Sequence, residues 1–312
     1  MANLTPEARG AREIDPGKGG GTLLARLGER LVTLAHLVRF SHSVFALPFA
    51  LASAAAAAAF APLTWGRLTW IIVAMVAART AAMAWNRLVD EEIDLENPRT
   101  RDRELPSGKV TPAAVLALVI VATGVFILAA AALGPLPLVL TPVAILILFG
   151  YSFTKRFTWA SQLALGLALA GAPLGAWIAV TGGLAAAPLL LGAAVLTWVA
   201  GFDTIYACQD VAFDRAHGLH SLPARFGIAT ALWIARALHL AAVIGFVLFG
   251  LALDRGIFYW LGVAVVAAAL VHEHRLVRAD DLSRVNRAFF DLNGIVSLAF
   301  LAAVLADRPW MR

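Results

Sequence analysis

The sequence has little charge and almost no cysteine. Only 14% of its 312 residues are Asp, Glu, Lys or Arg, and its single cysteine, Cys208, excludes an intrachain disulfide and a cysteine metal cluster. No charged residue occurs between Val110 and Thr154 or between Phe157 and Phe202. Because a membrane-spanning helix needs about 20 apolar residues, each stretch is long enough for two spans. A chain that is 61% hydrophobic is therefore an integral membrane protein, and we expect no soluble domain.

The apolar stretches predict an all-α membrane protein with about nine transmembrane helices. Their centres lie near residues 48, 80, 122, 145, 170, 198, 240, 264 and 298. The runs are long and lack the two-residue alternation of membrane strands, which favours helices over a barrel. Similar motifs at the ends of the second and sixth spans indicate two parallel four-helix repeats plus a final helix. We expect residues 25–312 to form one transmembrane domain and the polar, glycine-rich residues 1–24 to be a disordered tail.

Lys and Arg are distributed unequally between the two sets of predicted loops. One face has the N-terminal segment, the loop 99–109, Lys155 with Arg156, and the segments 215–225 and 275–287. The opposite face has only Arg67, Arg255, Arg308 and Arg312. The positive-inside rule therefore places the basic face in the cytoplasm. The net charge of +5 reflects this asymmetry, so we expect no nucleic-acid partner.

Two acidic clusters lie 120 positions apart, at the ends of the second and sixth spans. Their polar members are, in chain order, Asn86, Asp90, Asp94, Asp203, Tyr206, Gln209, Asp210 and Asp214. An even number of spans separates the clusters, so both face the cytoplasm. Each cluster has two aspartates at i and i+4, which share one helix face and repel each other. No lysine lies nearby in the sequence to neutralise them, which predicts a bound cation.

The types of ligand in these clusters favour Mg²⁺. Oxygen ligands without His or Cys suit a hard cation, and Mg²⁺ completes its shell with water and substrate phosphates. The loops from Asn97 to Gly108 and from Gly218 to Gly227 contain arginines and hydroxyl groups, the donors that a phosphate needs. Single charges at span ends are also interfacial anchors, and each loop alone is also an ordinary positive-inside loop. The matched pairs favour a diphosphate bridged by Mg²⁺ between the two clusters.

The clusters and their loops resemble the motifs of the UbiA superfamily of intramembrane aromatic prenyltransferases. The first motif, Asn-x-x-x-Asp-x-x-x-Asp followed by Asn-x-Arg-Thr-x-x-Arg-x-Leu-x-Ser-Gly, matches from Asn86 to Gly108, with Glu104 where many relatives have proline. The second, Asp-x-x-Tyr-x-x-x-Asp-x-x-x-Asp-x-x-x-Gly-x-x-Ser, matches from Asp203 to Ser221. A third element, Tyr151 to Lys155, resembles the family's Tyr-x-x-x-Lys, whose lysine contacts diphosphate. The resemblance covers about residues 30–305.

The resemblance implies an enzyme of the bacterial inner membrane that joins a polyprenyl diphosphate to an aromatic acid, with Mg²⁺ as cofactor and the active site facing the cytoplasm. The reaction is an electrophilic aromatic substitution in ubiquinone or menaquinone biosynthesis. The implied catalytic residues are Asp90, Asp94, Asp203, Asp210 and Asp214, with Asp203 as a candidate base. The implied metal ligands are Asn86, Asp90, Asp94, Asp210 and Asp214. The implied diphosphate ligands are Asn86, Arg99, Arg103, Ser107, Lys155 and Ser221. For the acceptor we expect Arg39, His42 and Tyr206, and for the prenyl chain a tunnel that faces the lipid.

Two acceptors and one different class of protein remain open. The start of the second motif, Asp203 to Ala207, resembles 4-hydroxybenzoate polyprenyltransferases. The segments Cys208–Asp210 and Arg39–Pro48 resemble a subgroup assigned to menaquinone synthesis by the futalosine route, which implies a naphthoate-type acceptor. An ion-coupled secondary transporter also combines repeats with inward polar groups, although its polar residues cluster at mid-span. Finally, the segment Phe289–Asn293 either lines the site or is simply a polar helix start.

Overall fold

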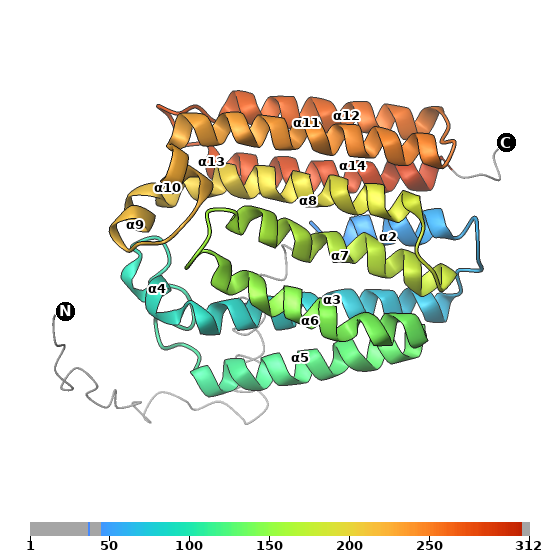
Figure 1. The fold of residues 1–312 in the computed structure, drawn as a ribbon, viewed down its shortest axis with the longest axis horizontal. Helices are drawn as coiled ribbons and strands as arrows, with labels where there is room; N and C mark the ends of the chain where they lie inside the picture. Colours follow the sequence, from blue (N-terminus) through green and yellow to red (C-terminus); the bar gives the residue numbers. More distant parts are fainter. Residues whose placement is uncertain (1–36, 38–44, 308–312) are drawn as a thin grey trace, which may run out of the picture.

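The computed structural model describes residue 37 and residues 45–307, and the described part is a helical bundle without a β-strand (Figure 1). The long or apolar helices are α2 (Leu47–Ala57), α3 (Trp65–Val89), α5 (Pro112–Leu133), α6 (Pro135–Thr154), α7 (Ser161–Thr181), α8 (Ala186–Ala207), α11 (Ile228–Ala252), α12 (Ile257–Leu276) and α14 (Asn293–Ala306). The short helices are α4 (Glu91–Glu96), α9 (Val211–Ala216), α10 (Leu222–Phe226) and α13 (Val285–Arg287). A 3₁₀ turn covers Cys208–Asp210, and a π-helical turn covers Ala288–Leu292. The predicted all-α fold is confirmed.

Eight helices of the described chain are long and apolar enough to cross a membrane, and each contains one predicted centre. The first predicted centre lies in α2, of which 11 apolar residues are described. The protein is therefore a multi-pass membrane protein, with a helix count close to the predicted nine. The predicted tail, residues 1–24, lies outside the described residues, and the division into tail and domain stays a prediction.

Local sequence signals define where several helices begin. Thr64 and Thr111 precede α3 and α5, and their hydroxyls accept hydrogen bonds from the backbone of Arg67 and Ala114 at 3.2 and 3.3 Å. Such N-caps satisfy donors that the first helical turn leaves free. Between α5 and α6 the chain reverses at Gly134, whose φ of 133° is accessible to glycine but strained for other residues. The two helices therefore form a tight antiparallel hairpin.

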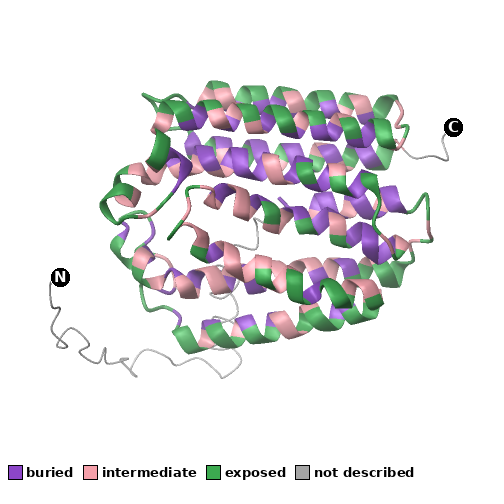
Figure 2. Cartoon of the chain, in the orientation of Figure 1, coloured by how far each residue is buried: buried purple, intermediate pink, exposed green. Residues whose placement is uncertain are grey.

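The core lies around α8, which packs against both α7 and α11, while α14 packs against α12 and α2. Figure 2 shows buried residues concentrated on these inner helices, whereas α5 is largely exposed. The exposed residues of α5 and α6 are mostly apolar, which suits contact with lipid. Small residues bring inner helices close: a Cβ added to Gly245 of α11 would lie 2.8 Å from the Ala194 Cβ of α8. Close backbone approach thus holds the bundle together.

The two repeats place both motifs at the same end of the bundle. The first motif follows α3, which packs against α5, and the second follows α8, which packs against α11 in the corresponding way. Figure 1 shows α4, α9 and α10 together at this end. His217 Nε2, just after α9, lies 3.3 Å from Glu96 Oε2 of α4. Both clusters therefore lie at the same end of the bundle, as an even number of intervening spans requires.

Candidate active site

Each motif helix is interrupted at the first aspartate of its pair. Asp90 lies between α3 and α4, with φ −96° and ψ 8°, and Asp210 ends the 3₁₀ turn before α9. Backbone hydrogen bonds continue through the first break, because Asp90 N donates to Asn86 O at 3.0 Å and Asp94 N donates to Asp90 O at 2.7 Å. The structure thus differs from the single helix face that we predicted for each pair. In the first pair the two carboxylates contact different partners, Asp90 with Lys155 and Asp94 with Arg103.

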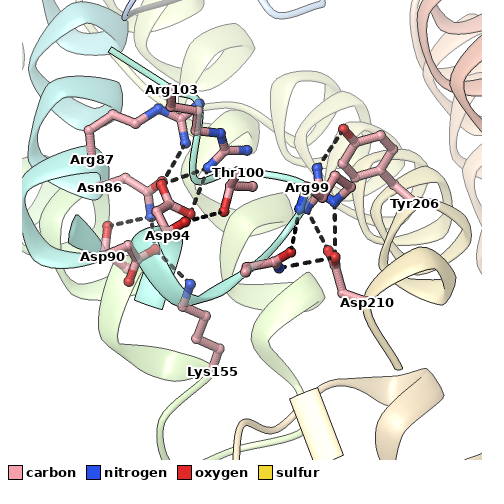
Figure 3. Close-up of polar contacts among 12 residues, drawn as sticks. Asn86, Arg87, Asp90, Asp94, Arg99, Thr100, Arg103, Lys155, Tyr206 and Asp210 are labelled. Carbon is pink, nitrogen blue, oxygen red and sulfur yellow. Dashed lines mark hydrogen bonds and ion pairs between the residues drawn. The ribbon is translucent and has the colours of Figure 1, made fainter. Parts of the chain in front are cut away.

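Asp90 is buried and contacts three basic or amide side chains. Its Oδ2 accepts hydrogen bonds from Lys155 Nζ at 2.7 Å and from Asn86 Nδ2 at 3.0 Å (Figure 3). Arg156 Nη2 lies 3.7 Å from Oδ1, and Oδ1 itself is buried without a hydrogen-bond partner. Lys155 is the C-cap of α6, so this contact joins the ends of α3 and α6. Asp90 therefore retains an unused acceptor oxygen within a basic environment.

Asp94 is held by two arginines of the first motif. Arg103 Nη1 donates to Oδ1 at 2.8 Å and to Oδ2 at 2.7 Å, and Arg87 Nη1 lies 3.7 Å from Oδ2. The Thr100 hydroxyl donates to the Asp94 backbone carbonyl at 2.9 Å. These contacts fold the loop after α4 back onto α3. The second aspartate of the pair is thereby neutralised by the loop that follows it.

Arg99 joins the first motif to the second. Its Nε and Nη2 donate to Asp210 Oδ1 and Oδ2 at 2.9 and 2.5 Å, a bidentate pair, and its Nη1 donates to Tyr206 Oη at 3.0 Å (Figure 3). Asn97 Nδ2 adds a contact of 3.3 Å to Asp210 Oδ1. Burial alone would lower the pKa of the Arg99 guanidinium, but the hydrogen bonds and charge of Asp210 outweigh burial and raise that pKa above its ordinary value. The Arg99 guanidinium therefore stays protonated at neutral pH.

The remaining predicted residues fall into three groups. Asp203, Asp214 and Ser221 line the same cavity as the residues above, and Ser221 Oγ donates to Asp214 Oδ2 at 2.8 Å. Ser107 lies outside this cavity, is exposed, and bonds to the Glu104 carbonyl at 3.4 Å. Arg39 and His42 lie outside the described residues. The structure thus brings together all the predicted residues that it describes except Ser107.

No lysine lies near the aspartates in the sequence, but the fold brings a basic side chain to three of them. Lys155 pairs with Asp90, Arg103 pairs with Asp94, and Arg99 pairs with Asp210. Lys155 lies 65 positions from Asp90, so its proximity depends on the packing of α3 beside α6. Ion pairs of this kind balance the repulsion that suggested a bound cation. Repulsion between the aspartates therefore no longer requires a bound cation. The case for a metal depends instead on the types of ligand that the site offers.

Two adjoining cavities define the site. A polar cavity of about 320 Å³ is lined by both motifs, and an apolar cavity of about 410 Å³ extends between α3, α5, α6 and α7. Five residues line both cavities, which places them side by side: Arg79, Met83, Tyr151, Leu165 and Leu169. The apolar cavity continues to Leu133 and Pro137 at the far end of the bundle. The arrangement suits an amphiphile with a polar head and a long apolar chain.

The sequence pattern of the UbiA prenyltransferase family matches residues 46–301. The chain belongs to this family. A 4-hydroxybenzoate octaprenyltransferase of Chromohalobacter salexigens is 35% identical over 252 residues, which cover 79% of this chain and 82% of the relative. Another, of Shewanella amazonensis, is 33% identical over 237 residues, or 76% of this chain and 81% of that one. The predicted resemblance and the predicted class of enzyme, a prenyltransferase, are confirmed.

Solved UbiA homologues share the fold. The apo structure of a homologue from Aeropyrum pernix superposes with a TM-score of 0.79 at 34% identity, covering 85% of this chain and 98% of that chain. A homologue from Archaeoglobus fulgidus, solved with GPP and Mg²⁺ bound, superposes with a TM-score of 0.70 at 19% identity and covers 88% of this chain and 98% of that chain. The second likeness bears on the fold alone. Both support the UbiA architecture of this bundle.

The donor set of this UbiA site fits a hard cation that is shared with a substrate phosphate. The side chains of both motifs that face the cavity offer carboxylate and amide oxygens, and Asp90 Oδ1 is buried without a hydrogen bond. Within the described ranges, no three acidic, His or Cys side chains converge as a complete ligand set. Mg²⁺ commonly uses one or two carboxylates and takes its other ligands from water and phosphates. The residues therefore fit Mg²⁺ together with a diphosphate.

Sequence reasoning missed several residues that line this UbiA site. Arg79 is the clearest case, because it lines both cavities and its Nε is buried without a hydrogen-bond partner. Arg79 lies about two helical turns before Asn86, where the first motif begins, and it matches no position of that motif. Asn97 and Arg87 lie within the matched motif region, yet only the fold shows that they contact Asp210 and Asp94. An arginine in the middle of a long apolar span is the signal that could have identified Arg79.

Proposed function

We propose that this protein transfers a polyprenyl group from an allylic diphosphate to an aromatic acid of the 4-hydroxybenzoate type, using Mg²⁺ at the cytoplasmic end of the bundle. The observation that carries this proposal is the position of the two aspartate motifs at the mouth of a long apolar cavity. The names of the relatives support the aromatic acceptor. The basic loops gathered at the site end support the cytoplasmic orientation.

The two motifs are suited to bind the departing diphosphate. Asp90, Asp94, Asp210 and Asp214, with Asn86, would hold Mg²⁺ between them and the substrate. Bound Mg²⁺ would supply Lewis-acid stabilisation of the leaving group. Lys155, Arg99 and Arg103 already point their donors at these carboxylates, so they lie where a diphosphate oxygen would meet them. Donors fixed in advance around developing negative charge stabilise the transition state without reorganisation.

The transfer itself replaces one bond with another. The allylic C–O bond breaks and its electron pair leaves with the diphosphate, and a ring carbon ortho to the acceptor hydroxyl forms the new C–C bond. The ring proton must then be removed to restore aromaticity. Asp203 lines the cavity, and its carboxylate has no hydrogen bond to another described residue, so we assign it the role of base. The apolar walls exclude water, which protects the allylic cation from hydrolysis.

Arg79 is our candidate for the acceptor carboxylate, in addition to Arg39 and His42. It lies where the two cavities meet, beside the point at which a bound prenyl diphosphate changes from polar to apolar. A guanidinium with a free donor can bind a carboxylate through charge-assisted hydrogen bonds. The Ser107 side chain lies outside the cavity and bonds to the Glu104 carbonyl. We therefore assign Ser107 a role in the shape of the loop and not a direct contact with the diphosphate.

Arg79→Leu is expected to raise KM for 4-hydroxybenzoate about thirtyfold, the factor that corresponds to one charged hydrogen bond, and to leave KM for the prenyl diphosphate within about twofold. Initial rates, with each substrate varied in turn, measure the two KM values separately. Arg67→Leu is the matched control, because Arg67 lies on the same helix but bonds to the Pro62 and Val180 carbonyls at the opposite end. Equal changes in both KM values would contradict the assignment.

The decisive experiment mixes purified full-length protein with Mg²⁺, a polyprenyl diphosphate and either 4-hydroxybenzoate or a naphthoate-type acid. We expect prenylated 4-hydroxybenzoate and free diphosphate, detected by mass spectrometry, and no product when Mg²⁺ is chelated. Product from the naphthoate alone would assign the protein to the other quinone pathway. Substrate flux across proteoliposomes without chemical conversion would instead identify a transporter and overturn the proposal.

A further inference from the structure

The last span begins with a π-helical turn that faces the polar cavity. The turn covers Ala288–Leu292, between α13 and α14. Such a turn contains one residue more than an α-helical turn and loses part of the regular hydrogen-bond pattern, and π-turns occur frequently at functional sites. Phe289 and Phe290 belong to this turn and line the cavity together with both aspartate motifs. The irregular turn therefore presents two aromatic rings to the proposed site.

The side chain of Asn293, the first residue of α14, contacts the backbone carbonyls of this turn. Its Nδ2 lies 3.2 Å from the Phe289 carbonyl and 3.4 Å from the Ala288 carbonyl, and 3.1 Å from Glu273 Oε1 of α12. Its Oδ1 accepts a hydrogen bond from Trp198 Nε1 of α8 at 2.8 Å. Because an indole nitrogen is only a donor, this bond fixes the amide with its NH₂ group toward the turn. All three side chains are buried, so the amide ties the turn to α8 and α12 without competition from water.

One face of α8 carries both the anchor of the turn and the surface that receives it. Trp198, Phe202 and Tyr206 are spaced four residues apart and therefore share a face of the helix. The Phe289 ring centroid lies 5.2 Å from that of Phe202 and 4.3 Å from that of Tyr206. Tyr206 in turn accepts the hydrogen bond from Arg99 described above. A continuous aromatic wall thus extends from the buried amide to the diphosphate end of the cavity.

We propose that Asn293 and Trp198 are positioning residues, which hold Phe289 against Tyr206 and so shape the aromatic wall that receives the acceptor ring. The inference rests on the proposed transfer to an aromatic acid. An aromatic ring packs well against offset or perpendicular rings, so a displacement of Phe289 weakens acceptor binding first. Of the proposed diphosphate ligands, Arg99 contacts this wall through Tyr206 Oη, and its bidentate pair with Asp210 keeps it in place when Phe289 moves. A purely structural role for the network would lower stability and leave the KM for each substrate unchanged.

Trp198→Phe tests the inference, because it removes the indole donor and keeps an aromatic ring in the core. We expect KM for the aromatic acid to rise about fivefold, as for the loss of one ordinary hydrogen bond, with KM for the prenyl diphosphate within about twofold. Phe289→Leu should raise the same KM. The double variant should have the same KM for the aromatic acid as Phe289→Leu alone, because both changes act through the same ring.

Tyr259→Phe is the matched control. It also removes one buried hydrogen bond, from Tyr259 Oη to the Phe246 carbonyl at 2.6 Å, in the same half of the bundle but away from the cavity. It should lower the thermal midpoint and change neither KM. If the wild type prenylates the aromatic acid and either Trp198→Phe or Phe289→Leu changes neither KM, this inference is overturned and the proposed function stands. A wild type that prenylates no aromatic acid overturns the proposed function and this inference with it.

Discussion

Asp90→Asn is expected to lower kcat by about 10³-fold, the scale of losing a main electrostatic contributor to the transition state. Asp90 is 3% exposed, keeps one oxygen free of hydrogen bonds, and sets the position of Lys155 Nζ at 2.7 Å. The amide preserves the size of the side chain but loses the carboxylate that contacts Lys155 and that we propose as a metal ligand. Turnover of the purified variant at saturating Mg²⁺ and prenyl diphosphate measures the loss.

Glu92→Gln provides the control for this experiment. Glu92 is an exposed carboxylate on α4, two residues from Asp90, and it does not line the cavity. The change removes the same charge from the same segment, so turnover should stay within about twofold, in line with a surface substitution. A folded Asp90→Asn variant with turnover near that of Glu92→Gln would rule out Asp90 as a residue that holds the metal.

The arrangement of spans was predictable because it depends on local composition. A membrane span needs a continuous apolar run, and the turn between α5 and α6 is marked by glycine and proline, so every centre could be placed without knowing which helices touch. The breaks at Asp90 and Asp210 were not predictable in this way. The residues around them are compatible with an unbroken helix, and the break is stabilised by partners such as Lys155 and Arg99, which the fold supplies from elsewhere.

The candidate site was predictable to the extent that it is encoded in short motifs. Asp90, Asp210 and Arg99 belong to patterns that a single sequence displays, and the structure places them in one network. Arg79 and Asn293 belong to no such pattern, and their roles depend on contacts between distant helices. Asn293 shows this well, because a polar residue at a helix start suggests a cap, whereas the structure uses it to join α8, α12 and α14.

Gly175→Phe is expected to shorten the prenyl chain that the enzyme accepts. Gly175 lies on α7 and lines the apolar cavity, and a Cβ added there would meet no atom within 4 Å. The phenyl group can therefore enter the cavity without displacing the backbone. With a rise of 1.5 Å per residue, Gly175 lies about 15 Å below Leu165, which borders the polar cavity. A long chain bound in this cavity would pass this point, whereas a short chain would end above it.

For Gly175→Phe we expect kcat/KM for a long polyprenyl diphosphate to fall about 10²-fold, because the phenyl group blocks the bound chain and removes several methylene contacts. Geranyl diphosphate should be used with kcat/KM within about twofold of the wild-type value.

Gly171→Phe should restrict the enzyme to still shorter prenyl chains, because Gly171 also lines the cavity and lies only about 9 Å below Leu165. Gly124→Phe on α5 is the control, since Gly124 has equal free space but does not line the cavity. Competition between diphosphates of different length in one reaction measures the preference directly. Because the order of the two limits follows from the positions along α7, a reversed order, or a loss that is equal for short and long chains, would place the prenyl chain outside this cavity.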